Sequence, residues 1–322
     1  MDARQSTSLE ARIGRVARSA LARLPRRGWQ GWLVEFLAFG LKQAWACLFG
    51  AAMLALILLT HLFYPADAEL ARYDALVIGA CLIQAAMLVW RLESWAEARV
   101  ILAFHLVGTA MEVFKTAAGS WSYPEPNLLR IGGVPLFSGF MYAAVGSYLA
   151  RAWRLFEFRF TRYPPRPATL ALALAIYVNF FAHHYGPDLR LGLFALVGLL
   201  WWGCRVHYRP LRHRLAMPLL VGFGLVALFI WFAENLGTFA RAWTYPDQAG
   251  GWRLVSPAKL GAWYLLMIIS FVLVTLVHRP EPEPPLPTEV SRKDLRPKDL
   301  QPKDPRPKDL PPKDPPPKEP VP

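Results

Sequence analysis

Cysteine is scarce in this chain of 322 residues, which contains only three of them. Cys47, Cys81 and Cys204 stand far apart and match none of the spacings by which cysteines hold a metal ion. The HxxxH and HExxH patterns of helical metal sites are also absent. The sequence therefore excludes a cysteine-rich metal domain. Because all three cysteines fall inside apolar segments, we expect them to be buried thiols.

Charge is also sparse, since charged residues make up 18% of the chain and hydrophobic residues 54%. Eight segments approach the roughly 20 apolar residues that a helix needs to cross a bilayer. They are residues 43–63, 74–90, 98–118, 132–150, 168–185, 189–204, 215–235 and 258–277. The sequence therefore predicts an all-α, polytopic membrane bundle of about eight transmembrane helices.

The first 28 residues lack the apolar core and the small-residue cleavage site of a signal peptide, so we expect none. Leu9, Ile13, Val16, Ala20 and Leu24 instead recur at helical spacing among arginines. This pattern predicts a basic amphipathic arm, suited to an anionic membrane surface. A disordered basic tail is the alternative.

The net charge of +13 does not indicate nucleic acid, because the basic residues lie before and between the apolar segments. Positive residues in such places set the orientation of membrane helices. With a cytoplasmic N-terminus and eight spans, the three inner connections carry 11 arginines and the four outer ones carry six basic residues. This bias predicts a bacterial inner-membrane protein with both termini in the cytoplasm.

The same short pattern occurs twice, 122 residues apart. Residues 112–142 and 234–264 align without a gap and are identical at nine of 31 positions, where chance gives about two. The identical pairs include Glu112 and Glu234. We therefore expect two four-helix repeats in parallel orientation, related by an axis along the membrane normal.

These features predict four parts of the chain. From Ser291 onward, six proline-rich pentads such as RPKDL favour polyproline II and offer no apolar surface to bury. They could form a spacer, a docking arm for a cytoplasmic partner, or a dispensable extension. The expected parts are a basic arm at 1–30, a first membrane repeat at 31–160, a second at 161–280 and a pentad tail at 281–322.

The two repeated glutamates are the candidate catalytic residues. Glu112 lies about six residues before the outer end of its span, roughly 9 Å deep at 1.5 Å per residue, and Glu234 lies at the equivalent depth. A carboxylate there is costly unless it is paired, protonated or facing a wet cavity. His105 and Thr116 share a helix face with Glu112, which predicts a polar stripe pointing into the bundle.

A WxYP turn follows each glutamate at the same distance. Trp and Tyr belong at the membrane interface, so anchoring explains them in part. Their fixed spacing from the glutamates also suggests a lid over a polar pocket. The candidate substrate-binding residues are Trp121, Tyr123, Trp243, Tyr245, Thr116, Thr238 and His105.

Histidines near the outer ends of two spans raise the question of a metal. His61, His183 and His184 lie at depths similar to those of the glutamates, and such a set could bind Zn or Fe. Alternatively, the carboxyl groups could relay protons. A structural role is also open, in which Glu112 pairs with Lys115 at i+3.

Four stretches of the sequence are recognisable: FGLKQAWACLFG, FHLVGTAMEVFKTAAGSWSYP with its continuation to 156, NFFAHHYGPDLR, and FAENLGTFARAWTYP with its continuation to 280. Over residues 31–280 the chain resembles the YoaT-type family of bacterial integral membrane proteins. That resemblance implies architecture and location, because the family is a domain of unknown function. A fainter similarity links Glu112, the GSWSY turn and the GVP segment at 133–135 to membrane carotenoid hydratases and lycopene cyclases. The cyclases carry acidic residues after that proline, where this chain has Leu136 and Phe137.

Three functions fit these observations. The first is acid-assisted modification of a lipid or isoprenoid substrate, with Glu112 as the acid and Glu234 as its partner or electrostatic stabiliser. The second is a proton-coupled transporter of small solutes, which the repeats favour. The third is a non-enzymatic membrane scaffold whose tail recruits a cytoplasmic partner.

Overall fold

The computed structural model describes residues 28–284, so nearly all of the basic arm and of the pentad tail lies outside the described residues. The described chain is mostly helical. Its α-helices are α2 (Trp29–Ala46), α3 (Leu48–Phe63), α4 (Arg72–Val89), α5 (Trp95–Ala117), α6 (Phe137–Leu155), α7 (Arg166–Ala182), α8 (Arg190–Leu200), α9 (Leu219–Phe239) and α10 (Ala258–Val274). Its short strands are β1 (Arg130–Ile131), β2 (Val134–Pro135), β3 (Arg159–Thr161), β4 (Arg205–Tyr208) and β5 (Leu215–Pro218).

Local sequence signals fix where several helices begin. The Ser94 hydroxyl accepts a hydrogen bond from the Glu97 backbone, and the Glu97 carboxylate accepts one from the Ser94 backbone. This capping box satisfies two of the amide groups that a helix start leaves open, and it starts α5. Proline precedes α9 at Pro218 and lies in the first turn of α7, where its missing N–H costs nothing.

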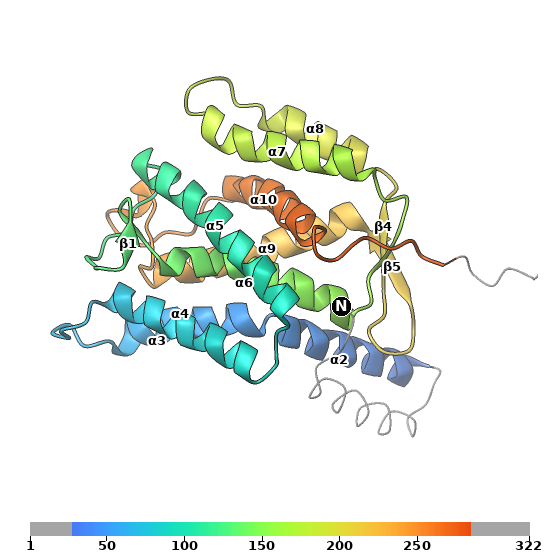
Figure 1. Cartoon of the computed structure of the whole chain (residues 1–322), viewed down its shortest axis with the longest axis horizontal. Coiled ribbons are helices and arrows are strands. Elements are labelled where there is room, and N and C mark those ends of the chain that lie inside the picture. Colours follow the sequence, from blue (N-terminus) through green and yellow to red (C-terminus); the bar gives the residue numbers. More distant parts are fainter. Residues whose placement is uncertain (1–27, 285–322) are drawn as a thin grey trace, which may run out of the picture. The chain divides into compact units, whose positions relative to one another are not determined.

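The helices run between two groups of connections (Figure 1). One group contains the antiparallel sheet β3–β4–β5, along which residues 281–283 pair with Phe160. We call it the sheet end. The other group contains the small β1–β2 hairpin, where the backbone of residues 128–129 hydrogen-bonds Asp74. We call it the turn end. It comprises the connections 64–71, 118–136, 183–189 and 240–257.

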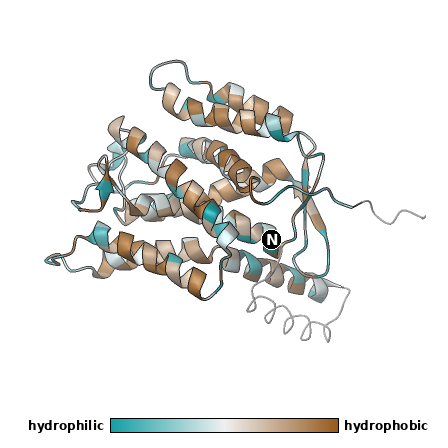
Figure 2. Ribbon diagram, viewed as in Figure 1, coloured by the Kyte–Doolittle hydropathy of each residue, from teal (hydrophilic) through white to brown (hydrophobic). Residues whose placement is uncertain are grey.

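A helix lies in each of the eight ranges predicted from hydropathy, and α2 precedes them. Three described helices, α4, α5 and α9, are long and apolar enough to cross a membrane. The number becomes four if α2 and α3, bent by 63° at their junction, form one broken span. The helices α7, α8 and α10 are apolar but shorter. Brown apolar residues cover most of the helical ribbons in Figure 2, in agreement with a membrane protein.

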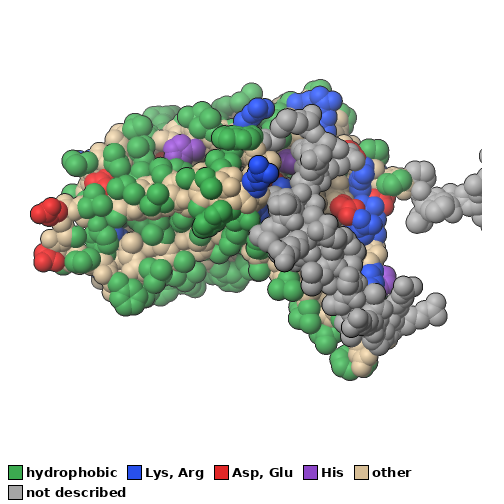
Figure 3. Space-filling view, turned by 60° about the horizontal axis from the view of Figure 1, so that its bottom comes forward, with side chains coloured by type: hydrophobic (Ala, Val, Ile, Leu, Met, Phe, Trp, Pro, Cys, Tyr) green, Lys and Arg blue, Asp and Glu red, His purple; other side chains and the backbone are tan. Residues whose placement is uncertain are grey.

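Large apolar side chains are exposed on the helices. Phe63 is 74% exposed, Leu199 74% and Phe229 69%. In the face shown in Figure 3, hydrophobic side chains extend over the helical part, and Lys and Arg gather toward one end. A soluble monomer rarely exposes so much contiguous apolar surface, whereas a bilayer would solvate it.

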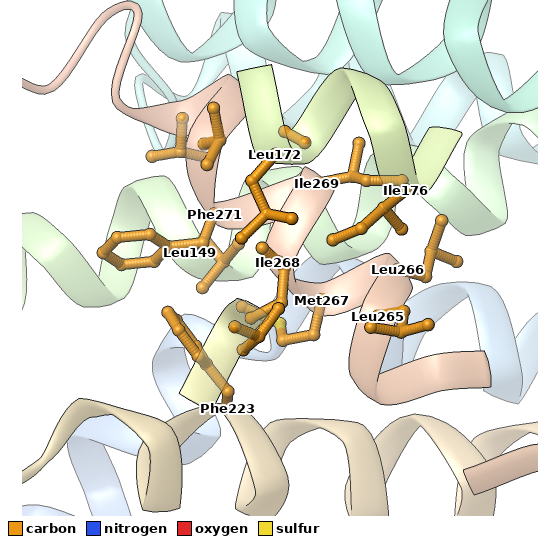
Figure 4. Close-up of a cluster of buried hydrophobic side chains, with 14 of the residues drawn as sticks. Leu149, Leu172, Ile176, Phe223, Leu265, Leu266, Met267, Ile268, Ile269 and Phe271 are labelled. Atoms are coloured by element: carbon orange, nitrogen blue, oxygen red, sulfur yellow. The ribbon is translucent and has the colours of Figure 1, made fainter. Parts of the chain in front are cut away.

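The largest buried cluster joins the helices from α5 to α10. Leu149, Leu172, Ile176 and Phe223 meet the inward face of α10 there (Figure 4). Helix α10 is therefore packed by the other helices on most of its sides, although its sequence is as apolar as that of an exposed span. The expectation of buried thiols is correct for Cys204 and wrong for Cys47 and Cys81, which lie on the outer surface of the helices.

Close packing between α5 and α6 depends on a glycine. A Cβ atom at Gly108 would lie 2.5 Å from Cγ of Tyr142. We expect Gly108→Ala to lower the free energy of unfolding by about 1–3 kcal/mol, because the helices would have to move apart. Gly192→Ala is the matched control, since nothing lies within 4 Å of its Cβ position. It should be neutral, or stabilising by up to about 1 kcal/mol. Unfolding of the two purified variants by denaturant would compare them, and equal stabilities would contradict the prediction.

Candidate functional site

The helices that carry the two glutamates end in the same way. Two residues after the end of α5, Gly119 has a φ of 72°, and the Ser120 amide donates a hydrogen bond to the Lys115 carbonyl at 2.9 Å. Two residues after the end of α9, Arg241 has a φ of 53°, and the Ala242 amide donates a hydrogen bond to the Gly237 carbonyl at 3.0 Å. Each helix is terminated by a residue in the left-handed conformation, and the amide of the next residue donates a hydrogen bond to the carbonyl five residues earlier. This is the pattern of a Schellman motif. These residues are 122 positions apart, so the repeated sequence forms a repeated turn.

The two turns pair directly with each other. Ser122 and Thr244 form an isolated antiparallel bridge, with both backbone N–H···O distances at 2.9 Å. Their hydroxyl oxygens lie 3.2 Å apart. Each residue therefore bonds its own counterpart in the repeat, as expected when two equivalent segments meet around a local two-fold axis.

Glu112 is buried, with 5% of its surface exposed, and is held by three aromatic donors. Trp121 Nε1 and Tyr123 Oη donate to its Oε2 at 2.7 and 2.6 Å, and Tyr142 Oη donates to Oε1 at 2.7 Å. The WxYP turn thus folds back over the carboxylate that precedes it. Two of these three donors were predicted as substrate-binding residues from the sequence.

Glu234 is 3% exposed and is held by two aromatic donors. Tyr245 Oη and Trp263 Nε1 each donate to one of its oxygens. Tyr245 is the counterpart of Tyr123, so this contact repeats. Trp243 is the counterpart of Trp121 but packs against Gly237, where a Cβ would lie 2.2 Å from its ring. Trp263 from α10 donates in its place.

A lysine and two aromatic rings connect the two carboxylates. The rings of Trp121 and Tyr245 meet edge to face, with centroids 6.2 Å apart. Lys259 Nζ lies 4.2 Å from the Tyr245 ring centroid and 5.9 Å from that of Trp121. Trp121 donates to Glu112 and Tyr245 donates to Glu234, so this ring contact joins the hydrogen-bond networks of the two carboxylates. The structure therefore places both candidate catalytic residues in one centre, which we call the paired-glutamate site.

The two turn tyrosines remain donors over the physiological pH range. Burial raises the pKa of Tyr245, and the charge of Glu234 raises it further. Burial and then the charge of Glu112 raise the pKa of Tyr123 in the same way. Both phenols therefore keep their protons and donate them in hydrogen bonds to the carboxylates.

The other predicted substrate-binding residues lie at varying distances from this centre. Thr238 donates to the Asn235 carbonyl at 3.2 Å and accepts from Trp252 Nε1 at 3.2 Å. The Thr116 hydroxyl is buried and has no hydrogen-bond partner in the described part of the chain. His105 lies two turns before Glu112 on α5, with its ring against Phe140 at 4.9 Å. None of the three donates to a glutamate.

The histidines do not form a metal centre in residues 28–284. No group of three or more His, Cys, Asp or Glu side chains could hold a metal ion there. His61 contacts Phe239, with ring centroids 5.7 Å apart. Lys115 Nζ lies 3.3 Å from His183 Nε2 and 2.9 Å from His184 Nε2. Lys115 is thus bound to imidazoles, and within residues 28–284 it forms no ion pair with Glu112, the alternative that their i+3 spacing left open.

Sequence reasoning did not anticipate the roles of Lys259 and Trp263. From the sequence alone, Lys259 is one of the six basic residues of the outer connections and has no further role. A signal was present, because Lys42, Lys115 and Lys259 are the only lysines between residues 28 and 284. Two of these three lie at the turn end, beside the repeated turns.

Comparison with known proteins places this architecture in a family. The family model described as "Protein of unknown function (DUF817)" matches residues 35–271. The chain belongs to the DUF817 family. The uncharacterised protein YoaT of Bacillus subtilis (strain 168) is 43% identical over 261 residues, which cover 80% of this chain and 97% of that protein. No solved structure matches.

The DUF817 match extends from within α2 into α10. It therefore includes both glutamates, both WxYP turns and Lys259. It excludes the basic arm and the pentad tail. The paired-glutamate site thus lies in the part of the chain that is common to the family.

Proposed function

We propose that this DUF817 protein is a multi-pass protein of the bacterial inner membrane, built from two parallel four-helix halves at 31–160 and 161–280. At the 122-residue offset, α3 corresponds to α7, α5 to α9 and α6 to α10. In support of two halves, α3 contacts α6 and the corresponding pair α7 and α10 is also in contact. Likewise α3 contacts α9, and the corresponding pair α7 and α5 is in contact. The N- and C-termini lie in the cytoplasm, with the basic arm on the membrane surface and the pentad tail free to meet a cytoplasmic partner.

The distribution of charge supports this orientation. The connections that carry the arginine-rich segments 159–166 and 205–214 meet in the β3–β4–β5 sheet. The sheet end is therefore the basic end, and it faces the cytoplasm by the positive-inside rule. The turn end, with the paired-glutamate site, then faces outward.

We propose that the paired-glutamate site performs acid-assisted chemistry on a lipid or isoprenoid substrate. The observation that carries this proposal is the set of partners around the two carboxylates. Both are buried, and within residues 28–284 their hydrogen bonds come only from neutral phenol and indole groups. No ion pair in the described part of the chain includes either of them. Buried carboxylates without a cationic partner within bonding distance are costly to keep charged, and in membranes such groups mark proton-handling sites.

Each group in the site has a role in this chemistry. Glu112 donates the proton, and Glu234 stabilises the positive charge that develops on the substrate. Trp121, Tyr123, Trp243 and Tyr245 line the mouth of the site. Thr116, Thr238 and His105 extend its polar wall.

The test is a charge-neutral replacement of the acid. Cells that lack the gene would receive wild-type protein, Glu112→Gln or Glu69→Gln, and their membrane lipids would be compared by mass spectrometry. We expect Glu112→Gln to lower formation of the product lipid by about 10²- to 10⁴-fold, the usual worth of a general acid. Glu69→Gln is the matched control, because Glu69 is an exposed glutamate in the α3–α4 connection at the same end. Wild-type lipid composition with Glu112→Gln at normal membrane levels would remove the proposal.

A proton-coupled transporter is the second candidate, because the halves are duplicated as in many transporters. It predicts solute uptake into proteoliposomes that depends on a proton gradient, with no change in lipid composition. A scaffold predicts neither result, and it predicts instead that removal of residues 281–322 abolishes the phenotype.

A further inference from the structure

Two lysine ammonium groups lie beside the paired-glutamate site without a carboxylate partner. Lys115 is 6% exposed, and its Nζ contacts the imidazoles of His183 and His184 at 3.3 and 2.9 Å. Lys259 is half-buried, and its Nζ lies over aromatic rings. Among residues 28–284 neither ammonium group forms an ion pair with an acid. Buried cations are costly unless an anion compensates them.

Further charges surround these lysines. Lys115, Lys259 and Arg190 repel one another. Asp188 is committed to Arg190, with a separation of 2.5 Å between Nε and Oδ2. Glu234, Asp188 and Asp247 act on the two lysines only over longer range. The ammonium groups therefore still have hydrogen-bonding capacity for an additional anion, which would reduce their repulsion.

An apolar groove of about 560 Å³ starts at the same end. It is lined by Phe194, Val197 and Gly198 of α8 and by Ala258, Gly261 and Tyr264 of α10. Helices α8 and α10 both begin at the turn end, where Arg190 and Lys259 stand in their first turns. The groove walls are therefore mostly apolar, and a cation stands in the first turn of each helix that forms them. Its volume lies within the usual range of ligand sites.

We propose that this corner binds one lipid with a phosphate head group, with the phosphate on Lys115, Lys259 and Arg190 and one hydrocarbon chain in the α8–α10 groove. Ammonium and guanidinium groups are the usual partners of phosphate oxygens. As an assignment of the substrate class this inference rests on the proposed function, but binding itself does not require turnover.

Binding can be measured without turnover. The full-length protein, purified in a neutral detergent, would be titrated with dioleoyl phosphatidic acid, dioleoyl phosphatidylcholine or inorganic phosphate and examined by native mass spectrometry. We expect phosphatidic acid to bind at least about tenfold more tightly than phosphatidylcholine, because only its head group exposes a phosphate monoester to the cations. Equal affinity for the two lipids would overturn the proposal.

Variants separate the head-group site from the groove. Lys115→Gln and Lys259→Gln should each weaken binding of phosphatidic acid by about tenfold, the worth of one charge-assisted hydrogen bond. Arg253→Gln is the matched control, since Arg253 is an exposed cation in the α9–α10 connection at the same end. The affinity of Arg253→Gln for phosphatidic acid should match that of wild type. An equal loss of affinity in all three variants would show that the lipid is attracted by surface charge in general, and the proposed site would be wrong.

A replacement in the groove tests the hydrocarbon chain. Gly198 has nothing within 4 Å of its Cβ position, so Gly198→Trp can fill the groove and leave the helix intact. Phosphatidic acid binding should fall in this variant. If it does not, and inorganic phosphate binds wild type as tightly as the lipid does, the site takes free phosphate and the lipid assignment is wrong.

Glu112→Gln distinguishes this inference from the proposed function. It should bind phosphatidic acid as wild type does, even if lipid chemistry is lost. If Glu112→Gln binds phosphatidic acid and lipid chemistry in cells is unchanged, only the proposed function is refuted. If Glu112→Gln abolishes lipid chemistry but the protein does not prefer phosphatidic acid over phosphatidylcholine, only this inference is refuted.

Discussion

Replacing Arg151 with alanine is expected to lower the free energy of unfolding by about 3–5 kcal/mol, because the buried Glu93 carboxylate would lose its cationic partner. Arg151 is fully buried in α6, and Glu93, which stands just before α5, is 5% exposed. An Arg151 Nη2 atom lies 3.3 Å from Glu93 Oε1, and its Nη1 donates to the Trp45 carbonyl at 3.1 Å. Unfolding of the purified variant in mixed micelles would measure the loss.

The control is an exposed ion pair of the same type. Arg209 pairs with Glu157, and their side chains are 45% and 47% exposed. Arg209→Ala should cost no more than about 1 kcal/mol, because water already solvates both charges. A second replacement, Glu93→Gln in the Arg151→Ala background, should recover part of the lost stability. Equal losses in Arg151→Ala and Arg209→Ala would show that burial of the Arg151–Glu93 pair is irrelevant.

Arg151 also shows where charge counting from the sequence was incomplete. The predicted span 132–150 stops one residue before Arg151, which therefore counts among the 11 arginines of the inner connections, but the structure has it inside α6, against Glu93 and Trp45. The positive-inside rule counts the Lys and Arg residues near each membrane face, and it does not indicate which side chains those cations contact. Glu93 is 58 residues earlier in the chain, so only the packing of α6 against the α4–α5 connection brings the two together.

The helices and the repeated turns were predictable from the sequence for simple reasons. Long apolar runs have few alternatives to helix in a membrane, so a helix occurs in each expected range. Glu112 and Tyr123 stand on a helix and on the turn that ends it, so their contact is local. The same holds for Glu234 and Tyr245.

The remaining contacts of the site were not predictable because they join distant elements. Trp263 reaches Glu234 from α10, and Lys259 lies over the rings of Trp121 and Tyr245, which stand in two different turns. Sequence symmetry does not identify the second donor to Glu234 either, since Trp243 occupies the position that corresponds to Trp121 but packs on Gly237. His61 and His183 are also 122 positions apart, yet each contacts a different group. Equivalent positions in a repeat therefore share backbone geometry more reliably than side-chain contacts.

Replacing Glu112 with leucine is expected to cost several kcal/mol of unfolding free energy, at about 1–3 kcal/mol for each buried donor left without an acceptor. Three donors would lose their acceptor together: Trp121 Nε1, Tyr123 Oη and Tyr142 Oη. Glu112→Gln should cost much less, because its amide oxygen still accepts. The difference between the two variants, measured by unfolding in mixed micelles, reports how much the donor network contributes to folding.

A double-mutant cycle with Tyr142→Phe identifies the origin of this cost. Tyr142→Phe removes one donor, so Glu112→Leu should be less damaging in that background by roughly the worth of one unsatisfied group, about 1–3 kcal/mol. If Glu112→Leu is as stable as wild type in both backgrounds, the donors find other partners and the carboxylate is not needed for folding. If Glu112→Gln folds normally while lipid chemistry disappears, the carboxyl group is needed for its proton. Stability and chemistry at Glu112 are therefore separable, because glutamine keeps the acceptor and loses the acid.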